Sequence, residues 1–121
     1  MADLTAREYY ERGIARYLAN DIDGAIADLT AALHLDPQFA EAYLALGTAY
    51  GESPAALENF TEAIRINPAY VQAYYNRGLA RGREGDYEGA IADFTRVLQL
   101  KPDHPQWRNL RLDIAEWRKR L

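Results

Sequence analysis

The sequence predicts an all-α fold of seven helices, arranged as three helix-turn-helix units and one final helix. The first observation is that alanine, a large apolar residue and proline recur three times with the same spacing: Ala25, Leu29 and Pro37; Ala56, Phe60 and Pro68; Ala90, Phe94 and Pro102. The second is a tyrosine four residues before a glycine in each unit: Tyr9 and Gly13, Tyr43 and Gly47, Tyr74 and Gly78. The third is the interval between prolines, 68 − 37 = 31 and 102 − 68 = 34 residues.

The first unit has clear start and stop signals for both helices. Thr5 and Glu8 have the spacing of a capping box, which predicts a helix from Ala6 to about Leu18. Asn20 and Asp21 interrupt that helix, and Asp21 caps a second helix through about residue 35. Asp36-Pro37 then ends it, because the residue before a proline disfavours the α conformation.

The second unit is three residues shorter than the third. Its first helix is predicted from Phe39 to Tyr50 and stops at Gly51. Ser53 caps the next helix, and Pro54 occupies its first position in a segment that runs to about residue 66. Because the three missing residues are lost at the end of its first helix, we expect this helix to be about one turn shorter than the first helices of the other two units.

The third unit contains predicted helices at residues 69–83 and 87–100, with Asp86 as a cap between them. A final helix is predicted at residues 105–120, and its apolar residues form one narrow stripe: Trp107, Leu110, Ile114, Trp117 and Leu121. The side of the helix opposite this stripe is charged, as expected for a lid over the end of a repeat stack.

The composition is that of an ordinary globular protein, with 49% hydrophobic and 26% charged residues. At 121 residues we expect a single domain, 1–121, with units at about 6–39, 40–70 and 71–104 and a capping helix at about 105–120. The first four residues lack the features of a secretory signal, so a cytoplasmic location is expected.

Nothing in the sequence favours catalysis, a cofactor or a metal site. There are no cysteines, and His34 and His104 are 104 − 34 = 70 residues apart and are expected at the surface. Ser53, the only serine, caps a helix, and Gly82 to Gly85 form a turn and no phosphate-binding loop. Residues 101–121 carry a net charge of 6 − 3 = +3 against 8 − 15 = −7 for the rest, and this acidic body opposes binding to nucleic acid. No segment predicts membrane binding or insertion.

An interval of about 34 residues with helix-turn-helix content is typical of the tetratricopeptide repeat (TPR). Together with the glycine, alanine, aromatic and proline signals, it means that the chain resembles the TPR family over nearly all of residues 6–104. The chain departs from the family where arginine replaces the usual leucine before the glycine and the usual tyrosine three residues after it. The four arginines are Arg12, Arg77, Arg16 and Arg81, and we expect the face that carries them to be unusually polar.

The resemblance implies a right-handed superhelical solenoid whose first helices line a concave groove. It also implies that the protein is an adaptor or scaffold, which binds a partner peptide or helix in that groove. The predicted groove consists of positions carried over from the family, together with two residues that flank the shortened helix, Tyr17 and Arg83. The full set is Arg7, Tyr10, Ile14, Tyr17, Glu41, Leu44, Thr48, Gln72, Tyr75, Asn76, Leu79 and Arg83.

Among these positions, Tyr10, Tyr17 and Tyr75 are the preferred partner contacts, although they could instead pack against neighbouring helices. Asn76 can hydrogen-bond a peptide backbone through both its amide donor and its acceptor. The shortened first helix of the second unit predicts a notch between Tyr17 and Arg83, or a merely tolerated deletion.

Capture of a heat-shock chaperone C-terminal tail is not favoured, because the lysine, arginine and asparagine side chains expected for it are replaced. The replacements are Tyr10, Ile14, Ala45, Gln72 and Asn76. The alternative to an adaptor is a homo-oligomer, assembled through the final helix or the groove, with Trp117 buried between chains.

Overall fold

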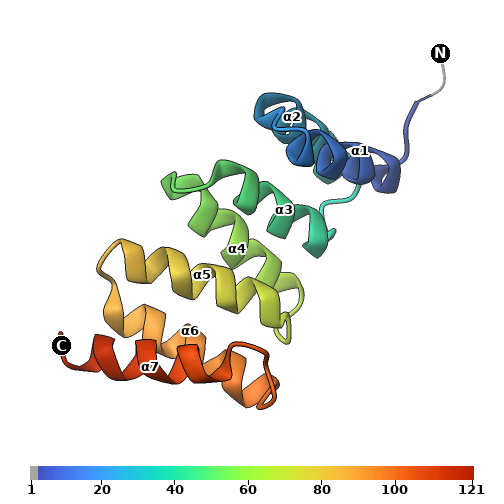
Figure 1. Ribbon diagram of the computed structural model, residues 1–121. Helices are drawn as coiled ribbons and strands as arrows, with labels where there is room; N and C mark the ends of the chain where they lie inside the picture. The colour runs from blue at the N-terminus through green and yellow to red at the C-terminus, as the bar shows by residue number, and fades with distance from the viewer. Residues whose placement is uncertain (1–2) are drawn as a thin grey trace. The chain divides into compact units, whose positions relative to one another are not determined.

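The computed structural model describes residues 3–121, which form two compact units, one that ends at Pro68 and one that runs Ala69–Leu121. The described residues contain seven helices and no strand, which confirms the all-α class (Figure 1). The helices are α1 (Ala6–Leu18), α2 (Ile22–Leu35), α3 (Ala40–Tyr50), α4 (Pro54–Ile66), α5 (Val71–Arg83), α6 (Tyr87–Leu100) and α7 (Trp107–Arg118).

The helix starts follow from the capping residues. Thr5 Oγ1 accepts a hydrogen bond from the Glu8 amide, and Glu8 accepts one from the Thr5 amide, which completes the predicted capping box of α1. Hydrogen bonds with Thr5 lower the pKa of Glu8; the bond from the Thr5 amide has the larger effect, and the bond with the Thr5 side chain adds to it. Asp21 and Asp86 cap α2 and α6 in the same way, each accepting from an amide three residues later at 3.0 Å.

Three starts differ from the prediction. Phe39 and Tyr70 are the N-cap residues of α3 and α5, so these helices begin one and two residues later than predicted, and α7 begins at Trp107. Helix α3 has 11 residues against 13 in α1 and in α5, so it is two residues shorter, about half a turn.

A glycine in the first helix of each helix pair lets the second helix of that pair pack closely. A Cβ atom added at Gly47 would lie 2.5 Å from the Phe60 ring, and one added at Gly78 would lie 2.6 Å from the Phe94 ring. Such distances are far inside van der Waals contact, so any side chain at these positions would push the helix pair apart.

The first unit has two apolar clusters, and the second has one. Leu29, Leu46 and Ala49 join α2 to α3, while Ala32, Phe39 and Ala42 fill the neighbouring part of the same unit. In the second unit, one cluster ties α7 to α6; its buried members are Phe94, Val97, Leu110 and Ile114. Helix α7 therefore covers α6, as predicted for a capping helix.

The ends of the predicted apolar stripe on α7 are not buried. Leu110 and Ile114 are in the core and Trp117 packs on Phe94 with ring centroids 4.9 Å apart, but Trp107 and Leu121 are exposed. His104 also differs from the prediction, since it is half-buried and stacks on Tyr75 at 5.4 Å.

Buried aspartates bridge the helices in two of the three pairs. Asp28 on α2 accepts two hydrogen bonds of 2.8 Å from Arg12 and pairs with Arg16 at 3.0 Å. These bonds from Arg12 lower the pKa of Asp28 and raise that of Arg12, against the opposing effect of desolvation. Arg12 and Arg16, two of the four arginines expected to make a face polar, thus share one buried partner.

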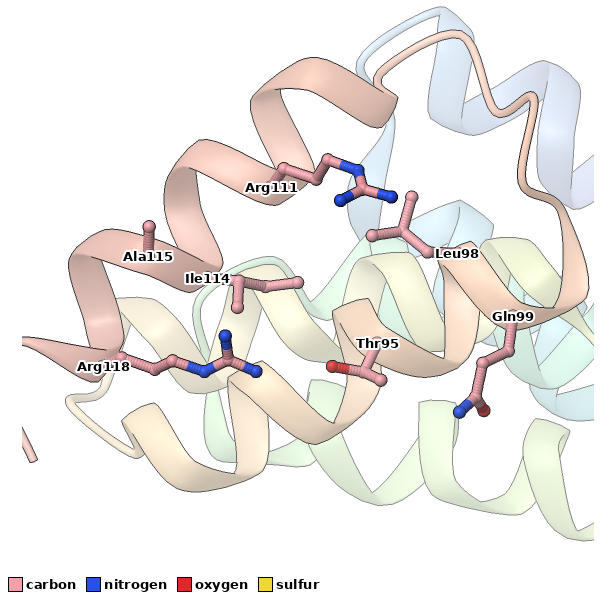
Figure 2. Close-up of a pocket in the computed structure, with 7 residues that line it drawn as sticks. All are labelled: Thr95, Leu98, Gln99, Arg111, Ile114, Ala115 and Arg118. Carbon is pink, nitrogen blue, oxygen red and sulfur yellow. The ribbon is translucent and has the colours of Figure 1, made fainter.

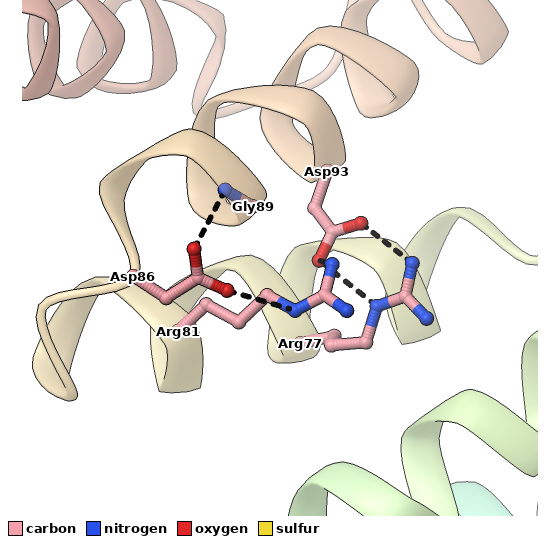
Figure 3. A network of polar contacts seen from close by, with 5 residues as sticks. All are labelled: Arg77, Arg81, Asp86, Gly89 and Asp93. Carbon is pink, nitrogen blue, oxygen red and sulfur yellow. Dashed lines mark hydrogen bonds and ion pairs between the residues drawn. The ribbon is translucent and has the colours of Figure 1, made fainter. Parts of the chain in front are cut away.

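A second buried aspartate joins α5 to α6 in the same way (Figure 3), and each such aspartate with its two arginines is called a clamp below. Asp93 accepts from Arg77 at 2.8 and 2.9 Å and from Arg81 at 3.1 Å. Arg81 also approaches the capping residue Asp86 at 3.7 Å, so the clamp is linked to the start of α6.

Candidate partner-binding face

The seven predicted groove residues of the first unit lie on α1 and α3. Arg7, Tyr10, Ile14 and Tyr17 occupy one stripe of α1 at steps of three and four residues. The α3 residues are spaced in the same way: Glu41, Leu44 and Thr48. The structure brings the two stripes together, because Arg7 and Glu41 form an ion pair at 3.8 Å.

One end of this face is an aromatic and charged cluster. Tyr10 and Phe39 have ring centroids 5.0 Å apart, and the Arg7 guanidinium lies 5.4 Å from the first ring and 5.0 Å from the second. Beside them is a surface hollow of about 450 Å³, whose lining includes Asp36 and Glu41. The hollow can take a polar group next to an aromatic surface.

The middle of the face is apolar and only partly covered. Ile14 and Leu44 are half-buried and belong to none of the three core clusters, so they are the apolar side chains of this face that the core engages least. Thr48 is exposed, and its hydroxyl donates to the Leu44 carbonyl at 3.0 Å.

The tyrosines are more deeply engaged than these two residues. Tyr10 and Tyr17 are half-buried and pack against the Leu29, Leu46 and Ala49 cluster. Part of each ring therefore supports the fold, and the rest remains accessible.

The remaining predicted residues lie on α5 in the second unit. Tyr75 stacks on Phe94 at 5.6 Å and, with Leu79, packs against the core of this unit. Asn76 accepts a hydrogen bond from Gln72 at 2.8 Å, so its acceptor already has a partner within α5. Arg83, in the last turn of α5, is exposed. One groove that joins the two units, and a notch between Tyr17 and Arg83, stay predictions.

The sequence reasoning missed Phe39 as part of this face. The sequence signal is a large aromatic residue just after Asp36-Pro37. In the structure Phe39 directly precedes α3 and is only 7% exposed, so its ring supports the face from within. The sequence predicts Phe39 as the first residue of the helix, whereas in the structure it is the N-cap and its ring lies 5.0 Å from that of Tyr10 on α1.

Among the described residues, no three histidine, cysteine, aspartate or glutamate side chains gather to hold a metal ion. None of the helices described is long and apolar enough to cross a bilayer. What this face offers is aromatic and aliphatic surface bordered by one charged pair.

Comparison with known families gives matches along most of the chain. Residues 71–104 match the family model described as Tetratricopeptide repeat. Residues 6–53 and 51–85 match the model described as TPR repeat. No curated protein sequence matches significantly.

Solved structures that are similar to this chain include the first TPR of Spaghetti (RPAP3) bound to the HSP90 peptide SRMEEVD, with 26% identity and a TM-score of 0.82 over 92% of this chain and 94% of that one. The Arabidopsis OM64 TPR domain is 28% identical, with a TM-score of 0.84 over 96% of both chains. MamA is 26% identical, with a TM-score of 0.80 over 94% of this chain and 74% of that one.

Proposed function

Because the chain belongs to the tetratricopeptide repeat family, we propose that it is a protein-interaction module that holds a peptide or helix of a partner protein against its first helices. The observation that carries the proposal is the pair Ile14 and Leu44. Both are aliphatic, half-buried and outside the core clusters, on adjacent helices of one unit. A partner that covered them would remove apolar surface from water.

The border of the face supports a proposal for the orientation of the partner. Arg7 and Glu41 are each about half exposed, with side-chain exposures of 58% and 48%, and their separation of 3.8 Å makes a weak surface pair. Either group can exchange this contact for an opposite charge on the partner. We propose that a charged residue of the partner lies here and an aliphatic one lies on Leu44.

The ligand is proposed to differ from a chaperone tail. A similar structure holds an HSP90 peptide, SRMEEVD. In this chain, however, the five positions that the family uses for such acidic tails carry no cationic side chain: Tyr10, Ile14, Ala45, Gln72 and Asn76. A peptide with carboxylates concentrated at its end would find few cations on this face.

The test is site-specific photo-crosslinking in a native lysate, with the crosslinker at residue 14 or 44. The matched control carries it at Ala27, an exposed residue of α2. Products that form at residues 14 and 44, but not at 27, support the proposal, and Leu44→Arg should abolish the product at 14. Equal products at all three sites, or none, would overturn it.

A second candidate function is homo-oligomerisation through α7. The observation in its favour is exposed apolar surface on or next to that helix, with exposures of 40% for Trp107, 67% for Leu112 and 72% for Leu121. Trp117 is occupied by Phe94 within the chain, so Trp107 is the better reporter. Sedimentation should give a mass that rises with concentration, together with a blue shift of Trp107 emission in a Trp117→Phe background.

A further inference from the structure

A second hollow, of about 350 Å³, lies between α6 and α7 (Figure 2). Leu98 and Ile114 supply aliphatic surface, and Thr95 and Gln99 supply polar groups from α6. The side chains of Arg111 and Arg118 reach from α7 toward α6 on either side of Ile114, as Figure 2 shows. The hollow therefore combines an apolar centre with a guanidinium group at each end.

Neither of these two arginines forms an ion pair within residues 3–121. Their neighbours differ, because Lys119 and Arg120 both pair with Glu116, at 3.7 and 3.8 Å. Arg111 lies 6.0 Å from the Trp107 ring, a contact that leaves its hydrogen-bond donors available. Two exposed guanidinium groups without carboxylate partners favour an anionic ligand.

The spacing of the two arginines specifies the ligand further. They are 118 − 111 = 7 residues apart on one helix, which places them about 10 Å apart along its axis. A helix laid alongside α7 would present carboxylates at that distance if its acidic residues were also seven apart. An aliphatic residue midway between them would point at Ile114 and Leu98.

We infer that this hollow is a docking site for an acidic amphipathic helix of a partner protein, with carboxylates seven residues apart and an aliphatic side chain between them. The site uses none of the twelve predicted groove residues and goes beyond the proposed function, because it provides a second point of attachment on α6 and α7. A partner that engaged both surfaces would gain from the high effective concentration of its second segment.

The sequence disfavours a second copy of this chain as the occupant. Only two pairs of its acidic residues are seven apart, Asp21 with Asp28 and Asp86 with Asp93. Asp28 and Asp93 are 3% and 2% exposed and are held by arginines. The chain thus has no pair of exposed carboxylates seven residues apart that could match Arg111 and Arg118 in the way proposed.

The experiment uses the full chain and a labelled, alanine-based helical peptide of about sixteen residues. The peptide carries two glutamates seven positions apart with a leucine between them, and a control peptide carries glutamines in their place. Fluorescence anisotropy should show binding of the glutamate peptide that weakens as salt is raised. The glutamine peptide should bind about tenfold more weakly.

The protein variants are Arg111→Glu and Arg118→Glu, each of which should weaken binding about tenfold. The matched control is Arg108→Glu, the same charge change on the same helix at a residue that stacks on Trp107 at 5.0 Å and lies outside the hollow. Circular dichroism verifies that all three variants are folded.

Three results would overturn the inference. One is no binding of the glutamate peptide to the wild-type chain up to about 1 mM. Another is an equal loss in Arg108→Glu, which would mean general attraction to a basic helix. The third is a wild-type chain that forms a dimer and does not bind the peptide, with the dimer dissociated by Arg111→Glu. In that case a second copy of the chain would fill the hollow. The crosslinking at residues 14 and 44 does not depend on any of these results.

Discussion

The pairs α1/α2 and α5/α6 are clamped by buried charge, whereas α3/α4 has apolar or neutral side chains at the same three positions. Where the clamped pairs have two arginines and an aspartate, α3/α4 has Leu46, Tyr50 and Asn59. Leu46 and Tyr50 belong to the Leu29 cluster, and the Asn59 amide donates to the Ala55 carbonyl within α4 at 2.8 Å.

Because all three pairs form the same hairpin, the clamp is not required for the fold itself. A buried ion pair contributes little net stability compared with apolar side chains of similar size, but the loss of one partner leaves a buried charge uncompensated. The clamped pairs should therefore be more sensitive to single substitutions than the unclamped pair, without being more stable.

The largest expected effect follows from Asp93→Ala. The side chains of Arg77 and Arg81 are 14% and 27% exposed, so the loss of Asp93 should lower the free energy of unfolding by about 3 kcal/mol. The matched change in the unclamped pair, Asn59→Ala, removes one hydrogen bond and should cost about 1 kcal/mol. Urea unfolding followed by circular dichroism measures both; equal losses would contradict the comparison.

The sequence predicted the helices well because their ends depend on local signals. Thr5, Asp21, Ser53 and Asp86 each act on amides within three residues, and a capping interaction of that range can be recognised in the sequence. Proline and glycine likewise end helices through their own backbone preferences.

The clamps were not predicted, because each joins residues 16 positions apart and depends on how closely two helices approach. A signal was present, however. Arg12 with Asp28 and Arg77 with Asp93 share one offset, and the unit that lacks the arginine also lacks the aspartate. Of the candidate face, the stripes could be predicted from helical periodicity. Whether Ile14 or Tyr10 is less engaged by the core could not be predicted, because Tyr10 is held by contacts with Phe39 and the Leu29 cluster that depend on the folded structure.

An intermediate effect is expected from pH at the first clamp. The pKa of Asp28 is below its ordinary value because of the bonds from Arg12, so the unfolded chain binds this proton more readily than the folded one. The resulting stability is fully present above about pH 4 to 5 and is lost as pH falls through the folded-state pKa.

The variant Asp28→Asn removes this titration. Its deficit relative to wild type, measured by urea unfolding, should be largest near neutral pH and should shrink below about pH 4. Glu58→Gln, at an exposed carboxylate of the unclamped pair, serves as the control. A deficit for Asp28→Asn that stayed constant from pH 7 to about pH 3 would mean that its ionised form does not contribute.

The smallest effect is expected when the whole clamp is exchanged for the residues of the unclamped pair. The triple variant Arg77→Leu, Arg81→Tyr and Asp93→Asn leaves no buried charge in α5/α6, and the new asparagine can donate to the Gly89 carbonyl as Asn59 does to Ala55. Its free energy of unfolding should stay within about 1 kcal/mol of wild type, although Asp93→Ala alone costs about 3 kcal/mol.

The reverse exchange in α3/α4, with Leu46→Arg, Tyr50→Arg and Asn59→Asp, supplies the control. It should be costly even though the new aspartate would have two arginine partners, because Leu46 and Tyr50 also pack on the Leu29 cluster of α2. A triple variant of α5/α6 as unstable as Asp93→Ala would show that the clamp itself contributes net stability. An equally tolerant reverse exchange would show that the three positions are interchangeable in every pair, so their difference would carry no energetic meaning.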